Sequence, residues 1–250
     1  MRLLDTATAI EGYRLLGYLV PSDLQQLIHV AKVRYFNPRE RLWTVGDPVP
    51  GPQLMISGLT RVYLENDQEE KTTLACLWPG DIPTASLQEH TEWGASSVAV
   101  SPVVHATLPV QFFLECCGRT PQLAYQMVVE LAHVYDTRSC WEARLKTVPL
   151  KRRLLRLFGR MADELGTPTE EGILLDFPLT HQVVADLSWV KRDQAGRTLN
   201  ELADEGYIVD RPRFRWLIPD RERLGPIPMI HPLMPQRIPT GGTTSGAIAR

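Results

Sequence analysis

A short run in the C-terminal third of the chain carries long polar and cationic side chains at helical spacing. It predicts a helix that begins near Lys191 and buries Ala195, Leu199 and Leu202 at steps of three and four. The other side of this helix shows Lys191, Arg192, Gln194 and Arg197. A guanidinium can donate two hydrogen bonds to the paired acceptors of a guanine, so a helix of this kind suits the DNA major groove.

A second short helix is predicted immediately before it. Thr180 has the side chain of a helix N-cap, and Val183, Val184 and Leu187 then form an apolar face. The two helices are separated by a tight turn around Trp189. This geometry predicts phosphate contacts from the N-terminal turns of both helices, by Thr180, His181, Gln182, Lys191 and Gln194.

A hairpin follows the second helix. The runs 207–210 and 215–218 are rich in apolar and aromatic residues, and Arg-Pro-Arg-Phe lies between them at 211–214. We expect Arg211 and Arg213, close to the tip of this wing, to contact the phosphate backbone.

The run Leu-Thr…Ala-Asp-Leu-Ser-Trp-Val-Lys-Arg-Asp-Gln-Ala-Gly-Arg, followed by Leu-Ala-Asp-Glu-Gly-Tyr-Ile, resembles the winged helix-turn-helix of the Crp/Fnr transcription regulators. The resemblance implies that Arg192, Asp193 and Arg197 face the DNA bases. The chain departs from the family pattern at two positions. Trp189 replaces the usual small residue of the turn, which would stiffen it, and Asp193 replaces a longer Glu.

The stretch from Val33 to about Pro109 has short apolar runs separated by Gly and Pro turns, which predicts a small antiparallel barrel or sandwich. It resembles the cyclic-nucleotide-binding β-roll of the same family at Gly46-Asp47, Ile56-Ser57-Gly58, Pro79-Gly80-Asp81 and Ser96-Ser97.

The nucleotide-binding positions of that β-roll are changed. The resemblance places the Glu that takes the ribose hydroxyl at Thr84-Ala85, and the Arg that neutralises the cyclic phosphate at Ala95. No Lys or Arg occurs between 72 and 118 to replace it. Because burying a phosphate without a cation is costly, we expect DNA binding without a cyclic nucleotide. Cys76, His90 and His105 could serve as haem ligands by residue type alone, which does not support a haem site, so no cofactor is expected. Another small ligand in the β-roll stays an alternative.

A long helix is predicted from Phe112 to Leu145. Its positions at alternating steps of three and four form a coiled-coil seam of dimer length, and the family uses this helix as its dimer interface. The seam consists of Ala124, Met127, Leu131, Val134, Arg138, Trp141 and Leu145. The alternative is an amphipathic helix that packs on its own β-roll, and Arg138 would be the weak point of a seam.

Charge and composition agree with two functional halves. Residues 1–143 carry ten Lys and Arg against sixteen Asp and Glu, whereas residues 144–223 carry fifteen against thirteen. No apolar run of 18 residues and no signal peptide occurs, so we expect a soluble, cytoplasmic protein without membrane contact. The four cysteines and six histidines have no metal-ligand spacing, which predicts free thiols, no metal site and no catalytic site.

The predicted fold class is α+β, with an N-terminal antiparallel β-roll, a long dimerisation helix and a C-terminal winged helix-turn-helix. The predicted domains are 1–120, 121–145 and 146–223, followed by a Pro- and Gly-rich tail at 224–250. We expect a bacterial, homodimeric, sequence-specific transcription regulator that binds a pseudo-palindromic promoter site and contacts RNA polymerase. A winged helix that docks another protein is the alternative from a different functional class, and an enzyme is a weaker one.

Overall fold

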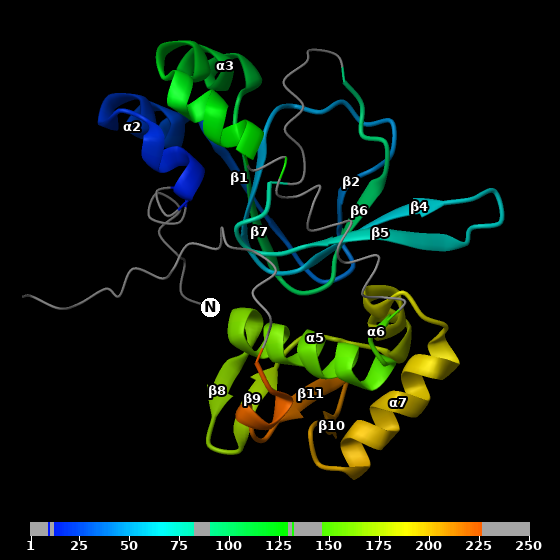
Figure 1. Ribbon diagram of the computed structural model, residues 1–250. Helices are drawn as coiled ribbons and strands as arrows, with labels where there is room; N and C mark the ends of the chain where they lie inside the picture. Colours follow the sequence, from blue (N-terminus) through cyan, green and yellow to red (C-terminus); the bar gives the residue numbers. More distant parts are fainter. Residues whose placement is uncertain (1–9, 11–12, 83–90, 130–131, 133–146, 227–250) are drawn as a thin grey trace, which may run out of the picture.

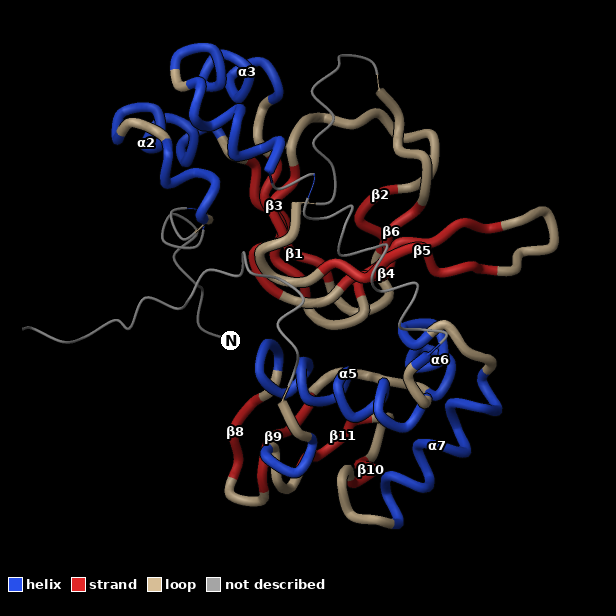
Figure 2. The backbone as a smooth tube through the Cα atoms, in the orientation of Figure 1, coloured by secondary structure: helices blue, strands red, loops and turns tan. Residues whose placement is uncertain are grey.

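The computed structural model describes residues 10, 13–82, 91–129, 132 and 147–226. Figure 1 shows two parts: an N-terminal part rich in strands, flanked by helices on one side, and a C-terminal part in which helices cover one face of a small sheet. Figure 2 shows the strands of each part gathered apart from its helices. Every pairing between the described strands is antiparallel, which confirms the predicted α+β class.

The N-terminal part is a roll of two antiparallel sheets. One sheet has the strand order β1-β7-β3, and the other has the order β2-β6-β4-β5. The strands are β1 Lys32–Phe36, β2 Arg41–Trp43, β3 Gln53–Ser57, β4 Thr60–Glu65, β5 Lys71–Leu77, β6 Ser96–Ala99 and β7 Val103–Thr107. Gly58 turns the chain from β3 into β4 at φ 89°, where a Cβ would lie 2.2 Å from the carbonyl oxygen of Pro102. Glycine is therefore required at this turn.

The interior of the roll is aromatic. The rings of Trp43 and Trp93 stack with their centroids 4.1 Å apart, and the His105 ring centroid lies 6.2 Å from those of both Trp43 and Phe36. Burial and the nearby Arg34 lower the pKa of His105 to about 4, so its ring is neutral at pH 7.

Helices cover the outer face of the β1-β7-β3 sheet. They are the 3-10 helix η1 Arg14–Tyr18, α2 Pro21–Val30, α3 Val110–Arg119 and a further helical stretch at 121–129. Phe113, Leu123 and Met127 pack with Leu54 and Leu108 of the roll in one hydrophobic core.

Met127 of the predicted seam is only 4% exposed, because its side chain packs in the hydrophobic core of its own chain. The seam itself stays a prediction. The apolar side chains that the stretch leaves exposed are Tyr125, Val128 and Val129. Ala124 is half-buried, and Leu131, Val134, Arg138, Trp141 and Leu145 lie outside the described residues.

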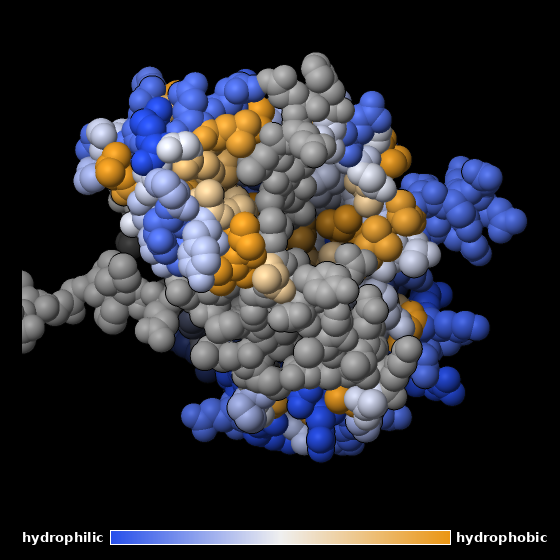
Figure 3. Space-filling view, turned by 45° about the horizontal axis from the view of Figure 1, so that its top comes forward, coloured by the Kyte–Doolittle hydropathy of each residue, from blue (hydrophilic) through white to orange (hydrophobic). Residues whose placement is uncertain are grey.

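The C-terminal part surrounds one hydrophobic core. A sheet with the order β10-β11-β9-β8 packs against α5, and α6 and α7 pack beside α5. The elements are α5 Leu150–Leu165, β8 Thr167–Thr169, β9 Gly172–Leu175, α6 His181–Ser188, α7 Arg192–Asp204, β10 Val209–Arg211, β11 Arg215–Ile218 and the 3-10 helix η2 Glu222–Leu224. The predicted pair of short helices and the following hairpin are thus present. In the view of Figure 3, the described side chains visible along the lower edge of the molecule are mostly hydrophilic.

Candidate nucleic-acid interface

Local contacts fix the N-terminus of α6 beside the tip of the wing. The Thr180 hydroxyl accepts a hydrogen bond from the Val183 amide at 3.2 Å, which is the predicted N-cap. The indole N–H of Trp216 donates to the Leu179 carbonyl at 2.9 Å, and the Leu179 amide donates to the Phe214 carbonyl at 2.8 Å. The wing tip and the α6 N-terminus therefore belong to one surface.

The turn between α6 and α7 is left-handed at Trp189, with φ 52° and ψ 48°. This conformation is unfavourable for a large side chain, and glycine or asparagine is the usual residue at such a helix end. The Trp189 indole N–H donates to the Thr73 carbonyl of β5 at 2.9 Å, and the Arg153 guanidinium donates to the Ser188 carbonyl at 3.0 Å. The turn is thus anchored from two sides, in line with the predicted stiffening.

The back of α7 is buried in the core, as the apolar spacing predicts. Ala195, Leu199 and Leu202 are fully buried. A Cβ on Gly196 would lie 3.2 Å from Nδ1 of His181, so glycine permits the close approach of α7 to the first turn of α6. His181 and the first two turns of α7 therefore lie side by side.

The front of α7 carries the predicted base contacts. Arg192, Asp193 and Arg197 are all exposed, and none of them has an ion pair or side-chain hydrogen bond within the described part of the chain. Asp193 lies in the first helical turn, where the helix dipole favours a carboxylate.

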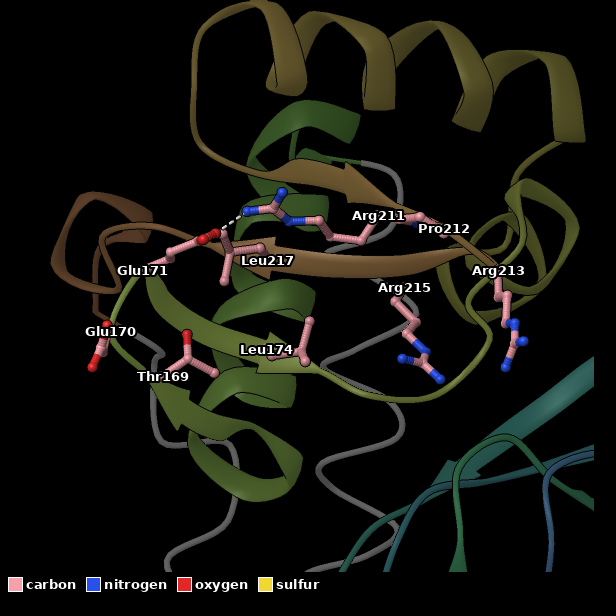
Figure 4. A pocket seen from close by; sticks show the side chains of 9 residues that line it. All are labelled: Thr169, Glu170, Glu171, Leu174, Arg211, Pro212, Arg213, Arg215 and Leu217. Carbon is pink, nitrogen blue, oxygen red and sulfur yellow. Dashed lines mark hydrogen bonds and ion pairs between the residues drawn. The ribbon is translucent and has the colours of Figure 1, made fainter.

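The wing arginines differ from one another (Figure 4). The Arg211 guanidinium pairs with the Glu171 carboxylate, and the Arg215 guanidinium pairs with Asp176 at 3.0 Å. Arg213 lies at the tip with φ 66°, is exposed, and has no carboxylate partner among the described residues. The three arginines and Glu171 surround a hollow of about 670 Å³ above Leu174 and Leu217.

The other residues predicted to contact phosphates differ in exposure and in partners. Lys191 is the N-cap residue of α7, and Lys191 and Gln194 lie at its exposed N-terminal end. His181 is half-buried beside the Trp216 ring, and the exposed Gln182 donates to the Asp186 carboxylate at 2.9 Å.

Cations with partners and cations without them both occur on α5 and on the wing, whereas the described cations at and on α7 all lack a partner among the described residues. Carboxylates pair with Lys151, Arg211, Arg215 and Arg221, while carbonyl groups or an aromatic ring engage Arg153, Arg160 and Arg223. Of the cations described between 150 and 226, those without such a partner are Lys191, Arg192, Arg197 and Arg213 on the α7 and wing surface and Arg152 and Arg156 on α5.

Asp186 is a charged residue of this region that the sequence patterns did not single out. It pairs with Arg61 of β4 at 2.5 Å, and the two side chains are 12% and 10% exposed. Burial raises the pKa of the Asp186 carboxyl, while Gln182 and Arg61 act in the opposite direction. No local spacing reveals this pair, because its members lie 125 positions apart.

Ala95, where the resemblance places the family's phosphate-binding arginine, lies immediately before β6. Its carbonyl accepts a hydrogen bond from the Trp43 indole at 3.0 Å. Thr84 and Ala85 lie outside the described residues.

Free thiols are confirmed for Cys76, Cys116 and Cys117, while Cys140 lies outside the described residues. Within the described ranges, no three His, Cys, Asp or Glu side chains group as metal ligands. None of the described helices is both long and apolar enough to cross a membrane.

Comparison with known proteins identifies the C-terminal part. The family model for the Crp-like helix-turn-helix domain matches residues 150–227. Residues 150–227 are a Crp-like helix-turn-helix domain. This match confirms the family resemblance predicted from the recognition helix and the wing.

Relatives extend the similarity to both parts of the chain. The global nitrogen regulator of Synechococcus elongatus is 23% identical over 182 residues, which are 71% of this chain and 82% of that protein. The structure of the c-di-GMP-responsive global regulator CLP of Xanthomonas campestris matches with a TM-score of 0.61 and 17% identity, over 80% of this chain and 100% of that one. A CRP-family transcriptional regulator of Thermus thermophilus matches with a TM-score of 0.60 and 23% identity, over 76% and 94%.

The β-roll, the helices and the winged domain together have the Crp/Fnr architecture. Residues 150–227 therefore match a DNA-binding type of domain, and the chain as a whole is similar to transcription regulators of the Crp/Fnr type. The relatives named above are described as regulators.

Proposed function

We propose that this protein is a homodimeric, sequence-specific transcription regulator in which Arg192, Asp193 and Arg197 face the bases of a two-fold symmetric duplex. The observation that carries the proposal is the set of cations on α7 and the wing tip that have no partner among the described residues. An exposed guanidinium without a carboxylate is free to donate to guanine, and it loses no internal ion pair when it does so.

The phosphate contacts follow from the same surface. Thr180, His181, Gln182, Lys191, Gln194 and Arg213 surround the base-reading face, and we assign them to the backbone of the duplex. Arg211 is a weaker member of the set, because its guanidinium already pairs with Glu171. Phosphate neutralisation supplies most of the affinity, so binding falls steeply with salt.

The dimer is proposed through the helix that begins at 121. The side chains of Tyr125 and Val128 are 61% and 63% exposed, and a second copy of this helix would bury them. A two-fold axis then presents two copies of α7 about one turn of B-DNA apart, which implies half-sites at that separation. On the family resemblance, RNA polymerase is the further partner, and the cytoplasm is the location.

The proposed regulator binds DNA without a cyclic nucleotide. Ala95 cannot supply a guanidinium to a cyclic phosphate, and the stacked rings of Trp43 and Trp93 are packed close to this position. A buried phosphate without a cation is costly.

The test is duplex binding by fluorescence anisotropy. A duplex selected by the protein from a random pool is titrated between low and high salt, alone and with cyclic AMP or cyclic GMP. We expect a steep salt dependence and no effect of either nucleotide. Salt-independent binding would favour the protein-docking alternative, and an affinity gain of about tenfold or more with a nucleotide would contradict nucleotide independence.

A further inference from the structure

The hairpin formed by β4 and β5 contacts the helix-turn-helix directly. In Figure 1 this hairpin extends from the roll to a position above α6. The Arg61 guanidinium of β4 reaches Asp186 of α6 at 2.5 Å, and it also donates to the Thr73 hydroxyl at 2.9 Å and to the Lys71 carbonyl at 3.3 Å. Three acceptors on two domains therefore fix one planar guanidinium.

Trp189 makes the second polar contact between the domains. Its indole N–H donates to the Thr73 carbonyl, so the same residue of β5 contacts both Arg61 and Trp189. The left-handed backbone at Trp189 is costly for a residue with a Cβ. The contact with β5 offsets part of that cost, which a small turn residue could not do.

Apolar packing accompanies these hydrogen bonds. Leu59, Trp78 and Val100 of the roll are buried in the same hydrophobic cluster as Leu154 and Phe158 of α5. The Arg160 guanidinium of α5 lies 4.1 Å from the centre of the Trp78 ring. The junction is therefore a packed interface and not a single ion pair.

The interface leaves the DNA-facing surface uncovered. It engages the last turn of α6 and the turn that follows, whereas Arg192, Arg197 and Arg213 remain exposed. The domains are thus joined in an arrangement in which base contacts are accessible.

We infer that Arg61 and Trp189 are positioning residues for DNA recognition, which fix the orientation of the winged domain on the β-roll and thereby the spacing between the two half-sites that a dimer accepts. The inference rests on the proposed function as a dimeric DNA-binding regulator. A rigid junction on each protomer sets the distance between the two copies of α7. If the junction is loosened, each winged domain can still bind a half-site, but its orientation relative to the β-roll is no longer fixed.

The experiment uses the full chain and three variants. Trp189→Phe removes the indole N–H and keeps an aromatic ring, and Arg61→Met removes the guanidinium and keeps an unbranched side chain. Arg41→Met is the matched control, because Arg41 is an exposed arginine of β2 whose side chain has no ion pair or hydrogen bond within the described residues. Each protein is titrated with a duplex selected by the wild type, with duplexes whose half-sites are moved closer or farther apart, and with a single half-site.

We expect both junction variants to lose about tenfold in affinity for the selected duplex, because a mobile second domain has a lower effective concentration at its half-site. They should also lose most of the wild-type discrimination between spacings and keep its affinity for the single half-site. Arg41→Met should behave as the wild type.

Two results would overturn the inference. One is an unchanged spacing preference in both variants. The other is a loss of affinity for the single half-site as large as that for the selected duplex, which would place the residues in the DNA-binding surface itself. If the wild type selects no duplex, the proposed function fails, and calorimetry still tests the junction. One unfolding transition in the wild type and two in the junction variants supports it, and the same transitions in all four proteins contradict it.

Discussion

Replacing Arg213 with alanine tests whether the wing contacts the DNA backbone. Arg213 is exposed at the tip of the β10–β11 hairpin and has no carboxylate partner among the described residues. Alanine keeps the Cβ, so the left-handed backbone at this position is strained to the same extent in both proteins. The substitution therefore changes little besides the charge.

The magnitude follows from counterion release. Each phosphate contact contributes about 0.9 to the slope of log affinity against log salt, so two wings in a dimer contribute about 1.8. Between about 50 and 200 mM salt, the affinity gap between wild type and variant should accordingly shrink about tenfold. Random and selected duplexes should be affected alike, because phosphates carry no sequence information.

Arg215 provides the matched control in the same hairpin. Its guanidinium is already paired with Asp176 at 3.0 Å, so Arg215→Ala removes the same charge without removing a free phosphate contact. Anisotropy titrations at several salt concentrations give the slopes. If the two variants change the slope equally, the wing does not contact phosphates through its tip, and the orientation assigned to the recognition surface is wrong.

Three further predictions concern readout, assembly and pH. Arg197→Ala should cost about 1–3 kcal/mol on the selected duplex and relax preference at one base pair, with little change on random duplexes. Val128→Glu should give monomers in sedimentation, while Leu64→Glu, which changes an exposed residue of β4, should leave the dimer intact. Because the pKa of His105 in the folded protein is about 4, stability that is present above the ordinary histidine pKa of about 6.5 should be lost as the pH falls towards 4, by about 3 kcal/mol. Chemical unfolding across this range should show that loss in the wild type and in His29→Gln, and a smaller loss in His105→Leu.

Helix α7 and the helix before it could be predicted in detail because local rules determine them. Apolar residues that recur every three or four positions predicted that Ala195, Leu199 and Leu202 lie in the core, and all three are fully buried. A hydroxyl at Thr180 predicted the N-cap that the structure shows. Such signals lie within a few residues of the element they specify, so a single sequence contains them.

The long helix shows what periodicity leaves open. A helix that packs on its own domain and also faces a partner carries two apolar stripes, and spacing alone does not say which stripe faces which. The predicted seam included Met127, which is buried with Leu123 in the core of its own chain. The exposed stripe at Tyr125 and Val128 lies on another side of the same turns.

The domain junction was beyond sequence reasoning for a different reason. Trp189 was identified as an unusual turn residue, but its hydrogen-bond partner Thr73 lies 116 positions away. Likewise, Arg61 and Asp186 are ordinary charged residues in their own segments. Contacts between distant segments depend on how the two domains pack, and no local pattern encodes that.

The boundary of the recognisable domain differs from the boundary of the packing unit. The Crp-like domain covers 150–227, yet its hydrophobic core includes Leu59, Trp78 and Val100 of the β-roll. Separating the two parts would expose these side chains, together with the apolar residues of α5 against which they pack, and burial of such side chains is the main stabilising contribution in a fold. The β-roll therefore has a structural role: it completes the hydrophobic core of the C-terminal part and contacts the turn that precedes α7.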